Sequence, residues 1–133
     1  MTHGLIITHG TYGRELVEVA GRILGVAPDI EAISMDWTGD GTEVVTQIER
    51  FLRKFKGERV LIFTDMFGGS PSNVAIRFVA PEIDVISGIN LPGLLKFICY
   101  KDKNITFREL VTIVRHGILE GITVISEYLG EKK

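Results

Sequence analysis

Hydrophobic residues along the chain form short continuous runs that alternate with longer segments in which they recur every three or four positions. The short runs, such as Leu5-Ile-Ile7 and Val60-Leu-Ile-Phe63, are typical of parallel strands that are buried on both faces. Polar residues or glycines follow these runs. The pattern predicts strands over residues 5–9, 30–35, 59–64 and 83–87.

The segments with helical spacing lie between these strands and after the last of them. One ends before Gly25, which suits a helix C-terminus, and Ser70 as N-cap with Pro71 after it suits the start of another. The predicted helices cover residues 11–24, 42–55, 71–79, 94–99 and 107–119, and a final strand is expected over residues 122–125. Alternating strands and helices indicate a three-layer α/β fold with a mostly parallel sheet, here in the flavodoxin-like order 2-1-3-4.

The length of 133 residues is that of one domain, and we expect a single domain over residues 1–133. The net charge is -2 and the basic residues are scattered, which argues against nucleic acid as a partner. No apolar run reaches the roughly 18 residues of a membrane span, so we expect no direct membrane insertion. Cys99 is the single cysteine and supports neither an intramolecular disulfide nor a zinc site, which favours a cytoplasmic location.

Two polar loops begin directly at the ends of the first and third predicted strands. His9, between Thr8 and Gly10, stands at the first of these ends, and Asp65 stands at the second. In the order 2-1-3-4 these strands are neighbours, and ligands bind where their carboxyl ends meet. We therefore expect His9 and Asp65 to face each other across one cleft. An aspartate that accepts from one ring nitrogen fixes the tautomer and leaves the other nitrogen as a nucleophile.

The loop after the third predicted strand also predicts an anion site. It leads into a helix N-terminus, where unpaired backbone N–H groups favour negative charge. Gly68 and Gly69 permit a close backbone approach, and Ser70 adds a hydroxyl donor. With Gly10 beside the histidine, these residues are the candidates for binding phosphate. A histidine, an orienting carboxylate and a phosphate site indicate phosphoryl transfer through phosphohistidine, for which no metal or cofactor is required.

Three motifs together resemble the enzyme IIA (EIIA) component of the phosphotransferase system (PTS), mannose family. They are Thr8-His-Gly10, Asp65-Met-Phe-Gly-Gly-Ser-Pro71 with Asn73, and Val85-Ile-Ser-Gly-Ile-Asn-Leu-Pro92. The motifs occur in the family's order and at its spacing, and the resemblance covers nearly the whole chain.

The resemblance implies a phosphocarrier in sugar transport or its regulation. His9 would accept a phosphoryl group from phospho-HPr and pass it to a IIB (EIIB) partner, which we expect to be a separate protein. Asp65 and Ser70 match the family's aspartate and hydroxyl residue. The resemblance also implies a homodimer in which a C-terminal antiparallel strand, here residues 122–125, is exchanged between subunits.

Two other functions use the same residues. In a phosphorylation-dependent regulatory module, phosphorylation of His9 would be a signal without onward transfer. A histidine phosphatase also places His-Gly after its first strand, but it needs an arginine immediately before the histidine, where Thr8 stands here. The chain is also short for a phosphatase of that fold.

The loop over residues 36–41 follows the second predicted strand, at the sheet edge that carries His9. Asp36, Trp37 and Asp40 are candidates for shaping the surface that a partner meets. A solvated loop anchored by its tryptophan explains these residues equally well.

Overall fold

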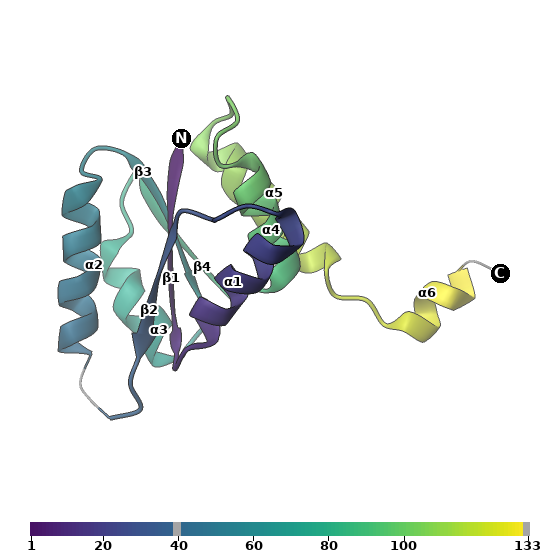
Figure 1. The fold of residues 1–133 in the computed structure, drawn as a ribbon, viewed down its shortest axis with the longest axis horizontal. Coiled ribbons are helices and arrows are strands. Elements are labelled where there is room, and N and C mark those ends of the chain that lie inside the picture. The colour runs from purple at the N-terminus through teal and green to yellow at the C-terminus, as the bar shows by residue number, and fades with distance from the viewer. Residues whose placement is uncertain (39–40, 132–133) are drawn as a thin grey trace.

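A four-stranded parallel sheet forms the centre of the computed structural model, which describes residues 1–38 and 41–131 (Figure 1). The strand order is β2-β1-β3-β4, as the sequence predicts, and each neighbouring pair is parallel. Asp40, a candidate in the loop after the second strand, lies outside the described residues. The strands are β1 (Thr2–His9), β2 (Ile30–Met35), β3 (Arg59–Thr64) and β4 (Ile83–Ser87).

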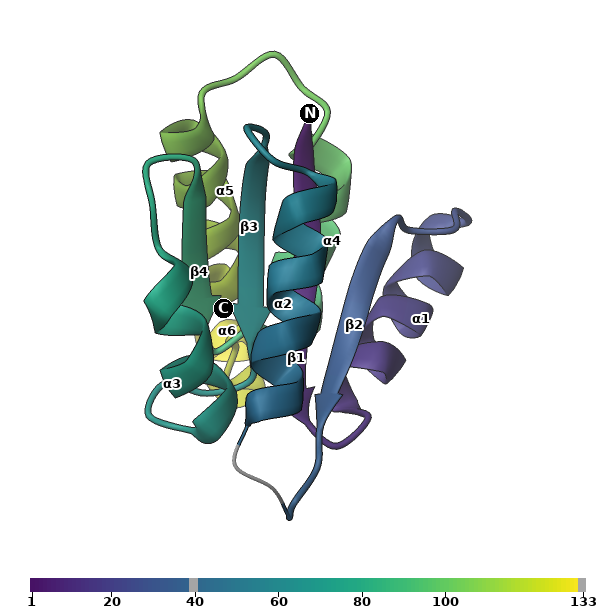
Figure 2. The ribbon, with the colours of Figure 1, turned by 90° about the vertical axis from the view of Figure 1, so that its left-hand side faces the viewer.

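Helices cover both faces of the sheet and give the expected three layers (Figure 2). The helical elements are α1 (Tyr12–Leu24), α2 (Thr42–Lys54), α3 (Ser70–Ala75), the 3₁₀ turn η1 (Ile76–Phe78), α4 (Leu91–Tyr100), α5 (Phe107–Glu120) and α6 (Ile125–Glu131). Helices α2 and α3 pack on one face, and α1, α4 and α5 pack on the other. None of these helices, within residues 1–38 and 41–131, is long and apolar enough to cross a membrane.

Side chains alternate along β1 between the two hydrophobic cores. Leu5 and Ile7 join the core that contains residues of α2, and Ile6 joins the core that contains residues of α4 and α5. All three are fully buried, which explains why this strand is continuously apolar.

The pairing of β1 with β3 positions the candidate site. Ile7 of β1 lies opposite Thr64, the last residue of β3. The carboxyl ends of these two strands therefore lie side by side. His9 ends β1 and Asp65 directly follows β3, so the register brings the two residues to the same point of the sheet edge.

The C-terminal segment differs from the prediction of a strand over residues 122–125. Residues 122–124 form no regular element, and α6 begins at Ile125. A strand needs a neighbour for its backbone hydrogen bonds, and no described strand pairs with this segment, whereas a helix satisfies those groups internally. The segment extends away from the sheet after α5 (Figure 1). It exposes the apolar side chains of Ile122, Val124, Ile125, Tyr128 and Leu129.

Candidate functional site

His9 and Asp65 meet as the sequence predicts. The Oδ2 atom of Asp65 accepts a hydrogen bond from the backbone N–H of His9 at 2.9 Å. It also lies 2.7 Å from Nδ1 of the His9 ring. A carboxylate only accepts, so Nδ1 carries the proton in this arrangement and Nε2 keeps its lone pair. The geometry thus leaves Nε2 as the nucleophilic nitrogen of the ring.

The Asp65 carboxyl is held in its ionised form. Burial by itself raises the pKa of this group, but the hydrogen bonds from the backbone and imidazole of His9 lower it further than burial raises it, and the net pKa lies below the ordinary value of 3.8. Only 13% of the Asp65 side chain is exposed, against 28% for His9. The acceptor is therefore charged and partly shielded from solvent at neutral pH.

Thr8 closes the turn that carries His9. Its hydroxyl accepts a hydrogen bond from the Gly13 N–H at 2.8 Å and donates one to the Gly10 carbonyl at 3.3 Å. The side chain is fully buried. Thr8 therefore ties the end of β1 to the first turn of α1, a role that the sequence alone did not reveal.

Gly10 adopts a positive φ of 54°, a conformation that favours glycine. Its backbone N–H donates to the Met35 carbonyl at 3.1 Å, which joins the His9 turn to the end of β2. Because this N–H is already engaged, Gly10 shapes the turn rather than offering a vacant amide to an anion.

Gly68 and Gly69 serve the loop after β3 in different ways. Gly68 has a φ of 86°, which a side chain would strain. At Gly69 the limit is space, because a Cβ atom there would lie 3.0 Å from Cε1 of His9. The loop backbone therefore packs directly against the edge of the imidazole.

The start of α3 differs from the prediction by one residue. Gly69 is the N-cap, Ser70 is the first helical residue and Pro71 the second, and the α-helix ends at Ala75 before η1. Proline is tolerated in the first turn because its missing N–H would have no helical partner there. Ser70 is exposed, and its hydroxyl is not used to cap the helix.

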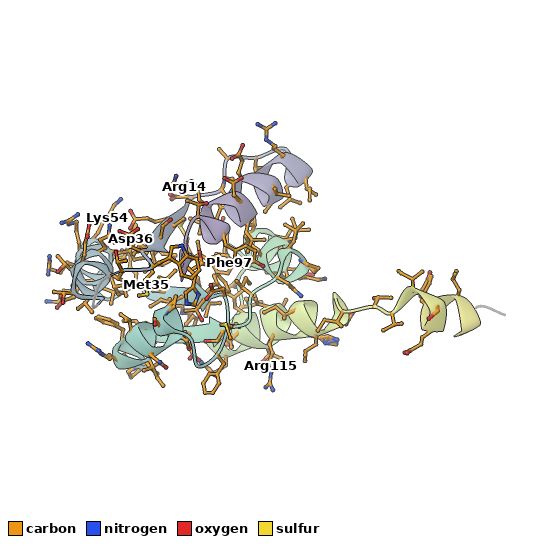
Figure 3. All side chains as sticks on the ribbon, turned by 90° about the horizontal axis from the view of Figure 1, so that it is seen from below. Arg14, Met35, Asp36, Lys54, Phe97 and Arg115 are labelled. Carbon is orange, nitrogen blue, oxygen red and sulfur yellow. The ribbon has the colours of Figure 1, made fainter. Side chains whose placement is uncertain are left out.

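A cavity of about 270 Å³ adjoins the imidazole. It has room for a group the size of several water molecules. Figure 3 looks onto this edge of the molecule and labels Met35 and Asp36, which come from the end of β2 and the loop after it. The lining residues are His9, Met35, Asp36, Trp37, Gly41, Ser70 and Val74.

Trp37 contacts the imidazole directly. The two rings are stacked, with centroids 5.4 Å apart and planes inclined by 20°. The sequence placed Trp37 at the right edge of the sheet, but it carried no signal for a contact between side chains 28 positions apart.

Metal-binding groups do not gather at this site. Among the described residues, no group of three or more His, Cys, Asp or Glu side chains is placed to hold a metal ion. The chemistry that the site offers is that of an imidazole oriented through Nδ1, with Nε2 left to react.

Comparison with known proteins decides the family. Residues 4–115 match the EIIA-man family, described as the PTS system fructose IIA component. The chain belongs to this family. The resemblance seen in the three sequence motifs is thereby confirmed.

Individual relatives agree with the EIIA-man assignment. The chain is 31% identical to the PTS system mannose-specific EIIAB component of Escherichia coli (strain K12), over 99% of this chain and 42% of that protein. It therefore spans less than half the length of that relative. It is 28% identical to the PTS system fructose-specific EIIA component of Bacillus subtilis (strain 168), over 97% of this chain and 90% of the relative.

A solved structure shows the same fold. The phosphotransferase system component EIIA from Streptococcus agalactiae superimposes with a TM-score of 0.84 at 24% identity, over 96% of this chain and 99% of that one.

Proposed function

We propose that this EIIA-man protein is a cytoplasmic phosphocarrier that accepts a phosphoryl group from phospho-HPr on His9 and passes it to a separate IIB partner. The observation that carries the proposal is the contact between Nδ1 of His9 and Oδ2 of Asp65 at 2.7 Å. It presents Nε2 as the nucleophile, which is what a phosphohistidine carrier needs. The family membership supports a role in the phosphotransferase system.

The transfer itself requires little of the protein beyond position and charge. The Nε2 lone pair of His9 forms a bond to phosphorus while the phosphorus–nitrogen bond of the donor breaks. The bonding pair returns to the donor's imidazole. The Nδ1 proton stays on His9, where the ionised Asp65 carboxylate balances the positive charge of the ring. The reverse sequence delivers the group to the IIB partner.

The loop after β3 is the proposed phosphate site. The backbone N–H groups of Gly68 and Ser70 have no hydrogen-bond acceptor within the part of the chain that is described. Ser70 lines the same cavity as His9, which supports its hydroxyl as a donor to a phosphoryl oxygen. Gly69 lets this backbone approach the ring, and Gly10 contributes by shaping the turn.

The proposal includes a homodimer built through the C-terminal segment. Within this segment the apolar side chains of Ile122, Val124, Ile125 and Leu129 are exposed. Strand β4 lies at the edge of the sheet and can pair with a further strand. In the dimer, residues 122–125 of one copy add to this edge of the other as an antiparallel strand. In the dimer this segment would be a paired strand, and it would no longer have the conformation described for the single chain.

Phosphate labelling tests the proposed function. Wild-type protein is mixed with HPr that carries a radioactive phosphoryl group, and label on this chain is followed over time. We expect His9→Ala to abolish labelling and His116→Ala to leave it unchanged, because His116 is an exposed residue of α5 paired with Glu120. Full labelling of the His9 variant would overturn the proposal.

The fate of the label separates the alternative functions. Onward transfer to a IIB protein supports the carrier, and a stable phosphoprotein that transfers nothing supports the regulatory module. Release of phosphate from an aryl phosphate, lost in His9→Ala, would support the histidine phosphatase. The buried Thr8 at the position of the arginine that a phosphatase requires disfavours that outcome.

A further inference from the structure

Trp37 is placed in an unusual way for a tryptophan. It is the only tryptophan in the chain, and 80% of it is exposed to solvent. Tryptophan is on average a highly buried residue, so this degree of exposure calls for an explanation. The stacking of its indole on the His9 imidazole is the one ring contact recorded for it among the described residues.

The backbone brings the segment that carries Trp37 beside the His9 turn. His9 and Met35 are paired residues of β1 and β2, and the Gly10 N–H donates to the Met35 carbonyl. Trp37 follows two residues later. The indole also lies beside Gly10, where a Cβ atom would stand 3.9 Å from the indole atom Cζ2. The end of β2 is therefore tied to the His9 turn two residues before Trp37.

The imidazole is thus restrained on three sides. Asp65 engages Nδ1, the Gly69 backbone packs against Cε1, and Trp37 covers one face of the ring. Asp65 fixes the tautomer and Gly69 limits movement in the ring plane. Only Trp37 meets the π face of the imidazole in this set.

We propose that Trp37 is a positioning residue for phosphoryl transfer, whose indole holds the His9 ring in place and stabilises the positive charge that the ring carries while Nε2 is bonded to phosphorus. This inference rests on the phosphocarrier function proposed above. The charge appears because Nε2 gives its lone pair to phosphorus while Nδ1 keeps its proton. The Asp65 carboxylate neutralises that charge from within the ring plane. The indole stabilises it through the stacked face of the imidazole.

The face of an aromatic ring attracts a cation, and tryptophan does so most strongly. At an exposed site the attraction corresponds to about a two- to fivefold change in an equilibrium or rate. An aliphatic side chain of similar bulk packs on the imidazole but lacks this attraction. Phenylalanine keeps the aromatic face and a smaller part of the effect.

A different role for the exposed indole is contact with the partner protein. That role predicts a weaker apparent affinity for the donor when Trp37 is replaced, with the maximal rate unchanged. The positioning role predicts a lower maximal rate with an unchanged apparent affinity for the donor, because the indole acts on the ring after the donor has bound. The two roles are therefore separated by measuring the maximal rate and the donor dependence independently.

The test uses single-turnover labelling of the full chain over a range of phospho-HPr concentrations. We expect Trp37→Leu to lower the maximal rate about two- to fivefold with little change in the half-saturating donor concentration. Trp37→Phe should restore part of the loss. The control is Val26→Ala. Val26 is an exposed apolar residue in the loop between α1 and β2, at the amino end of the strands, and its variant should match the wild type in rate and donor dependence.

Fluorescence of the single tryptophan gives a second readout. Phosphorylation of His9 should change the Trp37 emission of the wild type, and the His9→Gln variant mixed with the same donor should show no change. A wild-type rate in Trp37→Leu, an effect on donor affinity alone, or an emission that ignores phosphorylation would each overturn the inference. Absence of label on the wild type would instead overturn the proposed function, so the two failures are distinct.

Discussion

A single carboxylate oxygen, Oδ2 of Asp65, receives both the backbone N–H and the ring Nδ1 of His9, at 2.9 Å and 2.7 Å. The same oxygen atom therefore fixes the imidazole relative to the backbone at the end of β1. Rotation of the ring would break a charge-assisted hydrogen bond, which is stronger than one between neutral groups.

Replacement of Asp65 should slow phosphate uptake without abolishing it. Hydrogen bonds to charged groups contribute about 1.5 to 3 kcal/mol, which corresponds to about a ten- to hundredfold loss of rate in Asp65→Ala. Nε2 remains present in this variant, so label should still reach His9 at long times. The measurement is the initial rate of labelling from phospho-HPr, and a wild-type rate would contradict the orienting role.

The stability of the fold should depend on the ionisation of Asp65 at low pH. The folded-state pKa lies below the ordinary value of 3.8, so the stabilisation is fully present above that pH and is lost as the pH falls through the folded-state pKa. Urea unfolding of the wild type and of Asp65→Asn should show a clear difference at pH 5. That difference should shrink at pH 3, and an unchanged difference there would count against the assignment.

Gly69→Ala should damage the site while the fold survives. The backbone of Gly69 is extended, with φ -79° and ψ 165°, and alanine adopts this conformation without strain. The new Cβ atom would stand 3.0 Å from Cε1 of His9 and displace the ring from Asp65. We expect slower labelling with near wild-type unfolding. Gly130→Ala, where a Cβ meets open space, is the control for labelling and should be labelled at the wild-type rate.

Gly4→Ala should destabilise the protein through overpacking. A Cβ atom at this position in β1 would lie 2.6 Å from Cε2 of Phe97, a fully buried ring of α4. Added atoms in a well-packed core typically cost about 1 to 3 kcal/mol. Urea unfolding should show a lower midpoint with an unchanged slope. A midpoint equal to that of the wild type would show that Phe97 moves aside freely.

Removal of the C-terminal segment should prevent dimer formation. A chain that ends at Gly121 lacks the exposed apolar residues after α5 and the segment proposed to be exchanged. Sedimentation should show a dimer for the full chain and a monomer for the shortened one. A monomeric full chain would contradict the dimer and leave the His9 chemistry unaffected.

The sheet and the meeting of His9 with Asp65 follow from the sequence because they depend on strand order. Buried runs such as Val60-Leu-Ile-Phe63 mark parallel strands, and the order 2-1-3-4 makes β1 and β3 neighbours. Once these strands are adjacent, polar residues at their ends have to meet. The same reasoning locates the loop with Gly68 and Gly69 beside the histidine.

The remaining features depend on contacts that a local pattern does not encode. Residues 122–125, three of which are apolar, suit a strand or the start of a helix. Which one forms depends on whether a neighbouring strand is present. The stacking of Trp37 on His9 depends on the path of a loop. The start of α3 at Ser70 depends on Gly69 taking an extended backbone, and glycine permits several alternatives.

The buried hydroxyl of Thr8 has a further consequence for the proposed phosphorylated state of His9. A side chain that joins β1 to α1 cannot also extend a cation toward a phosphoryl group. Thr8 therefore offers no charged group at this position to assist hydrolysis of the proposed phosphohistidine. Under the proposed function, unloading of His9 therefore depends on encounter with an acceptor macromolecule.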